Sequence, residues 1–172
     1  MPVDFGLQMP SFPPEADDDG DVLGCYRRWV AAISPEFTTL WVSDHFQFGD
    51  TPILEGWTRL TYLAALFPHL KVGHLVLGQG YRNPALLAKM GATLQYLTGG
   101  RFILGIGAGW HEEEYRAYGY GYPSPGTRVA QLGEASRSSE HSGPNHRPPS
   151  RVTTTRSRMP TANHAPTPCP RF

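Results

Sequence analysis

The stretch LKVGHLVLGQGYRNPALLAKMGATLQYLTGGRFILGI, from Leu70 to Ile106, decides the fold class. It begins with an apolar run over 70–77 that is typical of a buried strand. Asn83-Pro84 then starts a helix, because proline favours the first helical position, and Gly99-Gly100 ends it. A second apolar run over 101–106 follows at once. A strand, a helix and a strand in this order predict a right-handed βαβ unit with parallel strands.

The same alternation extends to both sides of this stretch. Upstream, the residue pattern predicts strands over 3–9 and 38–43 and helices over 22–33 and 55–67. Downstream, a further helix is expected at about 127–135. Strands interleaved with helices predict a parallel α/β sheet, either an open doubly wound sheet or a (β/α)8 barrel. In both architectures ligands bind beyond the carboxyl ends of the strands.

The composition excludes several classes of protein. The 172 residues include 15 basic and 15 acidic side chains, which gives no overall reason to expect nucleic acid or a membrane surface as a partner. Cys25 and Cys169 lack CxxC or Cys/His ligand spacing, so we expect neither a disulfide framework nor a structural metal site. No charged-then-apolar leader opens the chain, and no apolar run approaches the roughly 18 to 20 residues that span a bilayer. A cytoplasmic protein is therefore expected.

The end of the chain has a different composition. Residues 136–172 contain seven prolines, eleven serines or threonines, six arginines and one acid, but no leucine or isoleucine. Such a segment cannot bury enough apolar surface to offset its ordering entropy, so we expect disorder. The sequence thus predicts an ordered domain over 1–135 and a disordered tail over 136–172. Because no aromatic residues are interleaved with the arginines, we do not expect the tail to bind nucleic acid.

An acid and a histidine, Asp44 and His45, directly follow the strand predicted over 38–43, in the segment LWVSDHFQF (40–48). One interpretation is that polar residues simply follow a strand as it leaves the core. The other is that the pair lines the mouth of an active site, because both architectures place ligands at this edge. The residues alone leave both interpretations open.

Two motifs between 105 and 115 match known site signatures only in part. GIGAGW (105–110) fails the GxGxxG dinucleotide pattern, because Trp110 or, in the other register, Glu112 stands at the last glycine position. Its glycines either let the strand end approach its neighbours or let the backbone approach a flat cofactor ring. HEEEY (111–115) lacks the second histidine of the zinc motif HExxH, so we interpret its acids as the start of a helix.

Four segments together carry a family resemblance: FGLQMPSF, LWVSDHFQF, VGHLVLGQGYRNPALLAKMGATLQYLTGGR and FILGIGAGWHEEEYRAYG. In this order and spacing, over about residues 3–135, they resemble the luciferase-like flavin and deazaflavin oxidoreductases, and most of all the coenzyme F420-dependent branch. The family fold is a (β/α)8 TIM barrel. The resemblance therefore implies that this chain forms an incomplete half barrel of about four βα units, followed by the tail.

The resemblance also implies roles for site residues. His45 is the implied catalytic acid/base, a task that suits histidine because it exchanges protons near neutral pH. The implied cofactor contacts are Asp44, Leu75-Val76, Gly107 and Gly109. Leu75-Val76 matches the position of a non-proline cis peptide behind the cofactor ring, and the two glycines match the strand end that approaches the cofactor. The implied cofactor is F420, with FMN as the alternative.

The implied activity is hydride transfer between F420 and a small organic substrate. Trp110 stands where sugar-phosphate dehydrogenases of the family have a glutamate, so we expect a different substrate. An FMN-dependent monooxygenase that uses reduced flavin and oxygen is the alternative enzyme.

A third interpretation is a non-catalytic remnant or a half-barrel interaction module. The barrel-like pattern stops abruptly after 133–135, as it would in a frameshifted or truncated reading frame. Half a barrel has open sheet edges and uncovered apolar faces, which lower stability. We expect a homodimer to be one way of covering them.

Overall fold

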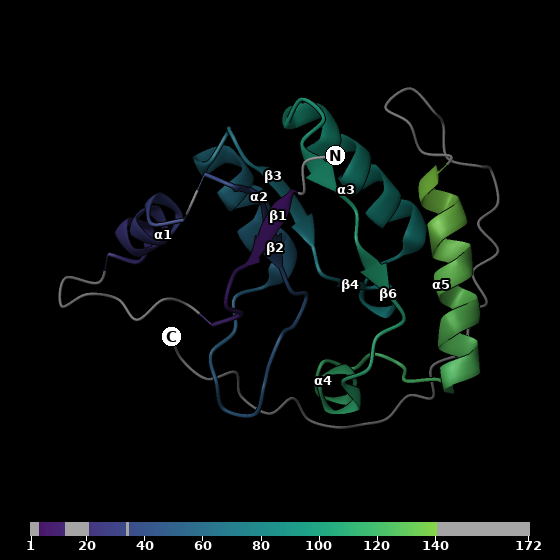
Figure 1. Cartoon of the computed structure of the whole chain (residues 1–172). Coiled ribbons are helices and arrows are strands. Elements are labelled where there is room, and N and C mark those ends of the chain that lie inside the picture. The colour runs from purple at the N-terminus through teal and green to yellow at the C-terminus, as the bar shows by residue number, and fades with distance from the viewer. Residues whose placement is uncertain (1–3, 13–20, 34, 141–172) are drawn as a thin grey trace.

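The computed structural model describes residues 4–12, 21–33 and 35–140. Strands and helices alternate along this part of the chain (Figure 1). The first elements are β1 (Phe5–Gln8), α1 (Val22–Ala31), β2 (Phe37–Val42), α2 (Gly56–Leu66), β3 (Lys71–His74) and α3 (Pro84–Leu97). The short or later elements are β4 (Leu77–Gly78), the 3-10 turn η1 (Gln79–Tyr81), β5 (Phe102–Ile103), β6 (Ile106–Gly107), α4 (Glu112–Ala117) and α5 (Pro125–Glu140). This order confirms the predicted α/β alternation.

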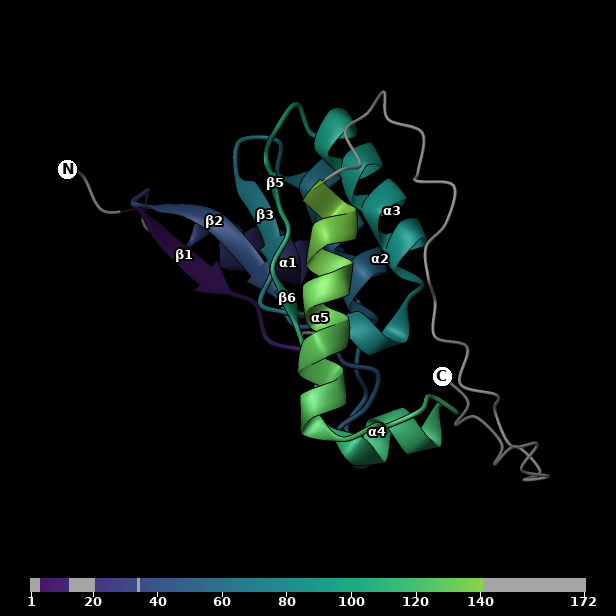
Figure 2. The ribbon, with the colours of Figure 1, turned by 90° about the vertical axis from the view of Figure 1, so that its right-hand side faces the viewer.

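The main sheet has four parallel strands in the order β1-β2-β3-β5, which is also their order along the chain. Leu7, Leu40, Val72 and Phe102 occupy neighbouring positions across these strands. A second parallel pair, β4-β6, continues the same two chain segments beyond β3 and β5. Helices α2 and α3 lie on one side of the sheet (Figure 2). Sequential parallel strands covered by helices form a partial α/β barrel, as predicted.

Local signals in the sequence set the helix boundaries. The Asp21 carboxylate accepts a hydrogen bond from the backbone N–H of Gly24 at the start of α1. The Asn83 side chain caps α3 in the same way, and Pro84 occupies the first helical position. Gly99, with a φ of 63°, follows the end of that helix. These side chains satisfy N–H groups that the first turn leaves unpaired. The predicted start of α3 at Asn83-Pro84 and its predicted end before Gly99-Gly100 are confirmed.

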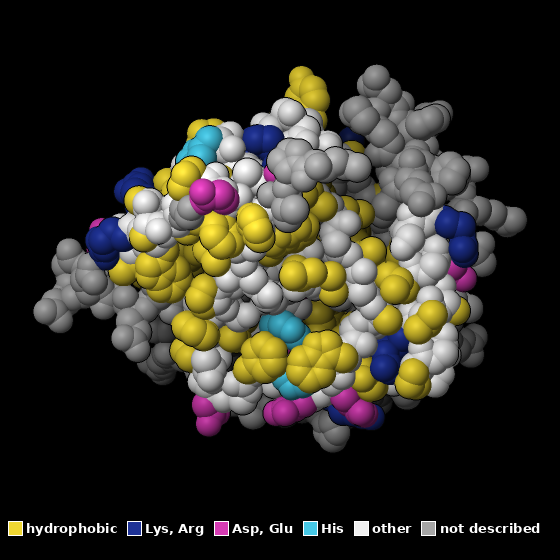
Figure 3. Space-filling model, viewed as in Figure 1, with side chains coloured by type: hydrophobic (Ala, Val, Ile, Leu, Met, Phe, Trp, Pro, Cys, Tyr) yellow, Lys and Arg dark blue, Asp and Glu magenta, His cyan; other side chains and the backbone are white. Residues whose placement is uncertain are grey.

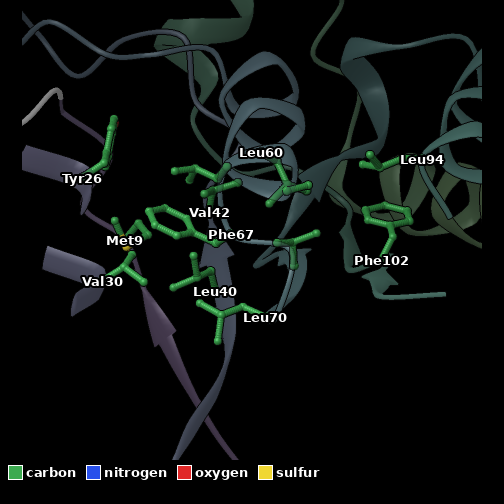
Figure 4. Packing of buried hydrophobic residues seen from close by; sticks show 13 residues of the cluster. Met9, Tyr26, Val30, Leu40, Val42, Leu60, Phe67, Leu70, Leu94 and Phe102 are labelled. Carbon is green, nitrogen blue, oxygen red and sulfur yellow. The ribbon is translucent and has the colours of Figure 1, made fainter. Parts of the chain in front are cut away.

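A hydrophobic core fills the space between the sheet and its helices (Figure 4). Leu40, Val42 and Val72 from the sheet are at most 1% exposed, and Leu60 and Leu63 of α2 pack in the same cluster. Each fully buried leucine or valine side chain contributes roughly 1.5–3 kcal/mol relative to an exposed one. The core thereby holds β2 and β3 side by side, and the residues that follow their carboxyl ends come together.

The two apolar runs of the predicted βαβ unit are each interrupted in the structure. Between β3 and β4 the Leu75-Val76 peptide bond is cis, as the resemblance implies. The chain changes partner there: the backbone N–H of Leu75 donates to Val42 O at 2.9 Å, whereas that of Leu77 donates to Gly105 O at 2.8 Å. A Cβ atom at Gly105 would lie 2.0 Å from the backbone oxygen of His74, so this approach requires glycine. The prediction of two continuous strands is therefore wrong at these points.

Helix α5 packs alongside α3 and runs to Glu140 (Figures 1 and 2). It therefore includes residues 136–140, which the sequence analysis assigned to the tail. They continue the helix directly from Ala135, which is buried. The expectation for residues 141–172 falls outside the described residues. None of the described helices is long and apolar enough to cross a bilayer.

His74, at the end of β3, is fully buried and stacks on Trp57 with ring centroids 5.3 Å apart. Burial lowers its pKa from 6.5 to about 3, because the charged imidazolium loses its hydration. The unfolded chain binds this proton below about pH 6.5, whereas the folded protein binds it only near pH 3. Protonation therefore favours the unfolded chain, and stability falls as the pH drops through this window.

We expect the free energy of unfolding to fall by about 2 kcal/mol between pH 7 and pH 5 through His74. Urea unfolding at both pH values, for the native sequence and for His74→Phe, measures this loss, because phenylalanine does not titrate. His69→Asn is the matched control, since His69 is exposed. It should keep the full pH dependence. If His74→Phe kept it too, other groups would be responsible.

Candidate active site

A pocket of about 330 Å³ opens where β2, β4 and β6 end. The carboxyl ends of these parallel strands meet at one edge, which is where barrel proteins bind their ligands. On the face shown in Figure 3, histidine side chains emerge between hydrophobic ones in the lower centre of the view. The site thus has both an apolar surface and side chains that can exchange a proton.

All of the site residues predicted from the sequence line this one pocket. Asp44 and His45 follow β2, the Leu75-Val76 peptide joins β3 to β4, and Gly107 and Gly109 lie at and beyond the end of β6. The Leu75 and Val76 side chains are 49% and 43% exposed, so an apolar surface faces the open side of the pocket. The structure therefore brings together residues that are up to 65 positions apart in the sequence, from 44 to 109.

The Asp44 carboxylate is buried and held by several donors. Its Oδ2 accepts hydrogen bonds from Arg82 Nη1 at 2.7 Å and from the backbone N–H of Gly78 at 2.9 Å, and its Oδ1 accepts from Arg82 Nη2 at 2.8 Å. Arg82 Nη2 also lies 2.6 Å from Glu55 Oε1, the residue that caps α2. Burial opposes the charge of Arg82, but its contacts with Asp44 outweigh this and raise its pKa. Asp44 thus ties β4 to the end of β2 and forms part of the pocket wall.

The two predicted glycines are required by packing. A Cβ atom at position 107 would lie 2.6 Å from Cγ2 of Val76. Gly109 has a φ of +79°, and a Cβ there would lie 2.2 Å from the hydroxyl oxygen of Tyr115. The first interpretation of GIGAGW, close approach to neighbours, is therefore supported. The same packing leaves backbone rather than side chains along one wall of the pocket.

Glu114 of α4 is a site residue that the sequence analysis did not identify. It is fully buried, and its Oε2 lies 3.0 Å from His45 Nδ1 and accepts a hydrogen bond from Tyr81 at 2.5 Å. Its Oε1 accepts hydrogen bonds from the backbone N–H groups of Phe46 and Gln47. Burial raises the pKa of this carboxyl, but the bonds from His45, Phe46 and Tyr81 outweigh burial and lower it overall.

Aromatic rings surround the exposed side of His45. Its ring centroid lies 4.4 Å from that of Phe48 and 5.8 Å from that of Trp110. His111 stacks on both Phe48 and Trp110, at centroid distances of 5.1 and 5.0 Å. Trp110 is 64% exposed and lines the pocket. Trp110 and His111 therefore present aromatic rings to a ligand on this side of the pocket.

His45, His111 and Glu114 also form the group that could hold a metal ion among the residues described by the structure. One nitrogen of each histidine and one carboxylate oxygen lie within 4.8 Å of one another. The Glu114 oxygens already accept three hydrogen bonds, from Phe46, Gln47 and Tyr81, and Oε2 makes a fourth with Nδ1 of His45. We therefore interpret this group as a hydrogen-bonded network around the histidine.

Most of the chain matches one protein family over residues 27–161, described as luciferase-like monooxygenase. The chain belongs to this family. The match to the luciferase-like family includes β2 to β6 and every residue of the pocket, and it continues past residue 135.

Two curated relatives in the luciferase-like family carry specific names. The phthiodiolone/phenolphthiodiolone dimycocerosates ketoreductase of Mycobacterium sp. (strain JLS) is 33% identical over 129 residues. The F420-dependent glucose-6-phosphate dehydrogenase of Kineococcus radiotolerans is 40% identical over 114 residues. Each match covers 63% of this chain and 33% of the relative. The chain thus spans about a third of the length of the curated relatives it matches.

Two solved structures of luciferase-like proteins share the fold. An F420-dependent secondary alcohol dehydrogenase, in complex with an F420-acetone adduct, has a TM-score of 0.63 and 22% identity over 80% of this chain and 41% of its own. The FMN-bound oxygenating constituent of 3,6-diketocamphane monooxygenase from Pseudomonas putida has a TM-score of 0.63 and 22% identity over 82% of this chain and 39% of its own. These two proteins are described with F420 and with FMN respectively, and their likeness to this chain is one of fold.

Proposed function

We propose that this chain carries the ring-binding part of an F420-dependent oxidoreductase, which transfers a hydride between the deazaflavin and an organic alcohol or carbonyl compound. The observation that carries the proposal is the pocket itself. It places the His45 imidazole within one cavity with the apolar Leu75-Val76 segment and the backbone of 107–109. A proton-exchanging group beside an apolar surface suits hydride transfer to a flat ring, because the surface can orient the ring and the group can move the accompanying proton.

The residues present fit such a ring. Leu75 and Val76 offer exposed apolar side chains, and a cavity of about 330 Å³ falls at the small end of the usual range for ligand sites, roughly 300–1,000 Å³. The backbone between Gly107 and Gly109 lies beside the Leu75-Val76 segment, and the Ala108 methyl is the one side chain that this stretch adds to the lining. Together the two segments would offer an apolar and backbone surface against which a flat ring can lie, and they would keep water from the face that they cover.

F420, when bound, supplies the hydride acceptor or donor. His45 would take the hydroxyl proton of an alcohol as the carbon of that alcohol loses its hydride, and would return the proton in the reverse direction. The products of the oxidation are then a carbonyl compound, a reduced cofactor and a protonated histidine. The aromatic surface of Phe48, Trp110 and His111 would orient the substrate beside the imidazole.

The names of the relatives favour alcohols and carbonyl compounds as the substrate class. A ketoreductase, a sugar dehydrogenase and a secondary alcohol dehydrogenase each interconvert a CH–OH group and a C=O group. Trp110 offers an exposed indole at the pocket rather than a charged group, which favours a substrate with apolar substituents over a sugar phosphate. The match covers about a third of the Mycobacterium and Kineococcus proteins, so it does not compare the residues that the other two thirds of those proteins contribute.

Fluorescence titrations with F420 and with FMN test the cofactor. We expect F420 to quench the tryptophan fluorescence of the chain in a saturable way, because Trp110 lines the pocket. Leu75→Asp should weaken F420 binding by about tenfold or more, since it places a charge against the ring. Leu86→Asp is the matched control, because Leu86 is similarly exposed, at 54%, but lies on α3 outside the pocket.

FMN-dependent oxygenation is the second candidate, and the FMN-bound structure with the same fold favours it. Saturable binding of FMN with no binding of F420 would replace the first candidate by this one. Binding of neither cofactor would favour the third interpretation, a non-catalytic half barrel.

A further inference from the structure

The orientation of the His45 imidazole is constrained at one nitrogen. Nδ1 lies 3.0 Å from Oε2 of the fully buried Glu114, and the ring rests 4.4 Å from Phe48. The same ring lines the pocket. A neutral imidazole has one nitrogen that donates and one that accepts, so the role of Nδ1 decides the role of Nε2.

The surroundings of Glu114 determine which way this hydrogen bond runs. The backbone N–H groups of Phe46 and Gln47 can only donate, and both point at Oε1. The hydroxyl of Tyr81 lies 2.5 Å from Oε2, and burial together with this contact raises the pKa of Tyr81, so it keeps its proton. Donors thus converge on both oxygens, as they do on an ionised carboxylate. An ionised carboxylate has no proton to give, so Nδ1 of His45 must donate.

We propose that Glu114 is a positioning residue that holds His45 as the Nδ1–H tautomer and thereby leaves Nε2 as the proton acceptor that serves the pocket. The catalytic meaning of this inference rests on the proposed function, whereas the tautomer does not. Glu114 itself does not touch the ligand space, because it lies behind the imidazole and does not line the pocket. It acts through His45, in the way that a buried hydrogen-bond partner fixes the tautomer of other functional histidines.

A merely structural role for Glu114 makes a different prediction. Its bonds to Phe46 and Gln47 anchor the loop after β2, so removing the carboxylate would loosen that loop whatever the tautomer of His45. Tyr81→Phe separates the two roles, because it removes one hydrogen bond from the same carboxylate and leaves the contact with His45 in place. Loss of stability is expected in both variants, and a change of tautomer only when the carboxylate is lost.

The tautomer can be read directly from ¹⁵N NMR spectra of the full chain labelled at histidine, recorded at a pH where the ¹⁵N shifts themselves show the His45 ring to be neutral. A His45→Asn sample assigns the signals. In the native sequence we expect the Nδ1 of His45 to carry the proton. Glu114→Ala should shift the population toward the Nε2–H form that free imidazole side chains prefer, and Tyr81→Phe should keep the native tautomer.

A native spectrum that shows His45 mainly as the Nε2–H tautomer would overturn the proposal, even if Glu114→Ala failed to fold. Retention of the Nδ1–H form in a folded Glu114→Ala variant would overturn it as well. A native Nδ1–H tautomer in a chain that binds neither F420 nor FMN would leave the role of Glu114 intact and contradict the proposed function. The two claims therefore fail separately.

Discussion

Replacing His45 with asparagine should lower the rate of F420-dependent alcohol oxidation by about 10²–10⁴-fold, the usual contribution of a positioned acid or base. Asparagine keeps a polar side chain of similar size but cannot take up the hydroxyl proton. The affinity for F420 should stay close to that of the native chain, because the apolar contacts of Leu75 and Val76 remain. Absorbance of F420 during turnover of a series of secondary alcohols measures the rate, and fluorescence quenching measures the affinity.

His69→Asn is the control for this substitution, since His69 is exposed and precedes β3, at the opposite end of the strand from the pocket. It should turn over F420 like the native chain. Undiminished turnover in His45→Asn would remove His45 from the mechanism, and a native chain that binds F420 without any turnover would restrict the proposal to binding.

Replacing Arg82 with methionine should lower the free energy of unfolding by about 3–5 kcal/mol, because it leaves the buried Asp44 carboxylate without its charged partner. Methionine keeps most of the aliphatic length of the side chain, so the loss reports the guanidinium. Urea unfolding at neutral pH measures the difference. Adding Asp44→Asn to the variant should recover part of it, because the uncompensated charge is then removed.

Arg116→Met is the matched control for Arg82→Met. Arg116 pairs with Glu112 on the exposed surface of α4, where an ion pair contributes about 0–1 kcal/mol. Equal effects of the two arginine substitutions would mean that the buried Asp44–Arg82 contact adds no more stability than an exposed ion pair.

The parts of the fold that depend on local signals could be predicted from the sequence. Asp21 and Asn83 cap their helices by reaching two or three residues along the chain, and the apolar spacing between such caps marks the covered faces. The breaks in the third and fourth predicted strands depend instead on backbone from elsewhere in the fold. Gly105 passes close to the carbonyl of His74 where the strands change partners. The glycines of GIGAGW indicated a close approach, but nothing in either segment indicated which backbone group they meet.

The candidate site shows the same division. Asp44 and His45 could be placed at the ligand edge because residues that follow a strand in a parallel α/β fold lie there. Their partners could not, because Arg82 and Glu114 reach them from 38 and 69 positions away. Three consecutive glutamates in HEEEY are equivalent as letters, and only the packing of α4 buries the last of them.

Glu112 and Glu114 lie in the same first turn of α4 but have different surroundings. Glu112 is exposed and pairs with Arg116 within the same helix, as the interpretation of these acids as helix-starting charges predicts. Glu114, in the same turn, accepts hydrogen bonds from the backbone N–H groups of Phe46 and Gln47 in the loop after β2. The interpretation from sequence is therefore confirmed for the helix and incomplete for its third acid.

The most direct test of the account is to map the F420-binding surface by backbone NMR on the labelled chain. Titration with F420 should shift signals from residues 44–45, 75–78 and 107–111, which line the pocket, and leave those of α1 and the exposed face of α3 unchanged. Shifts that cluster elsewhere, or no shifts at saturating F420, would contradict the claim that this pocket holds the deazaflavin ring.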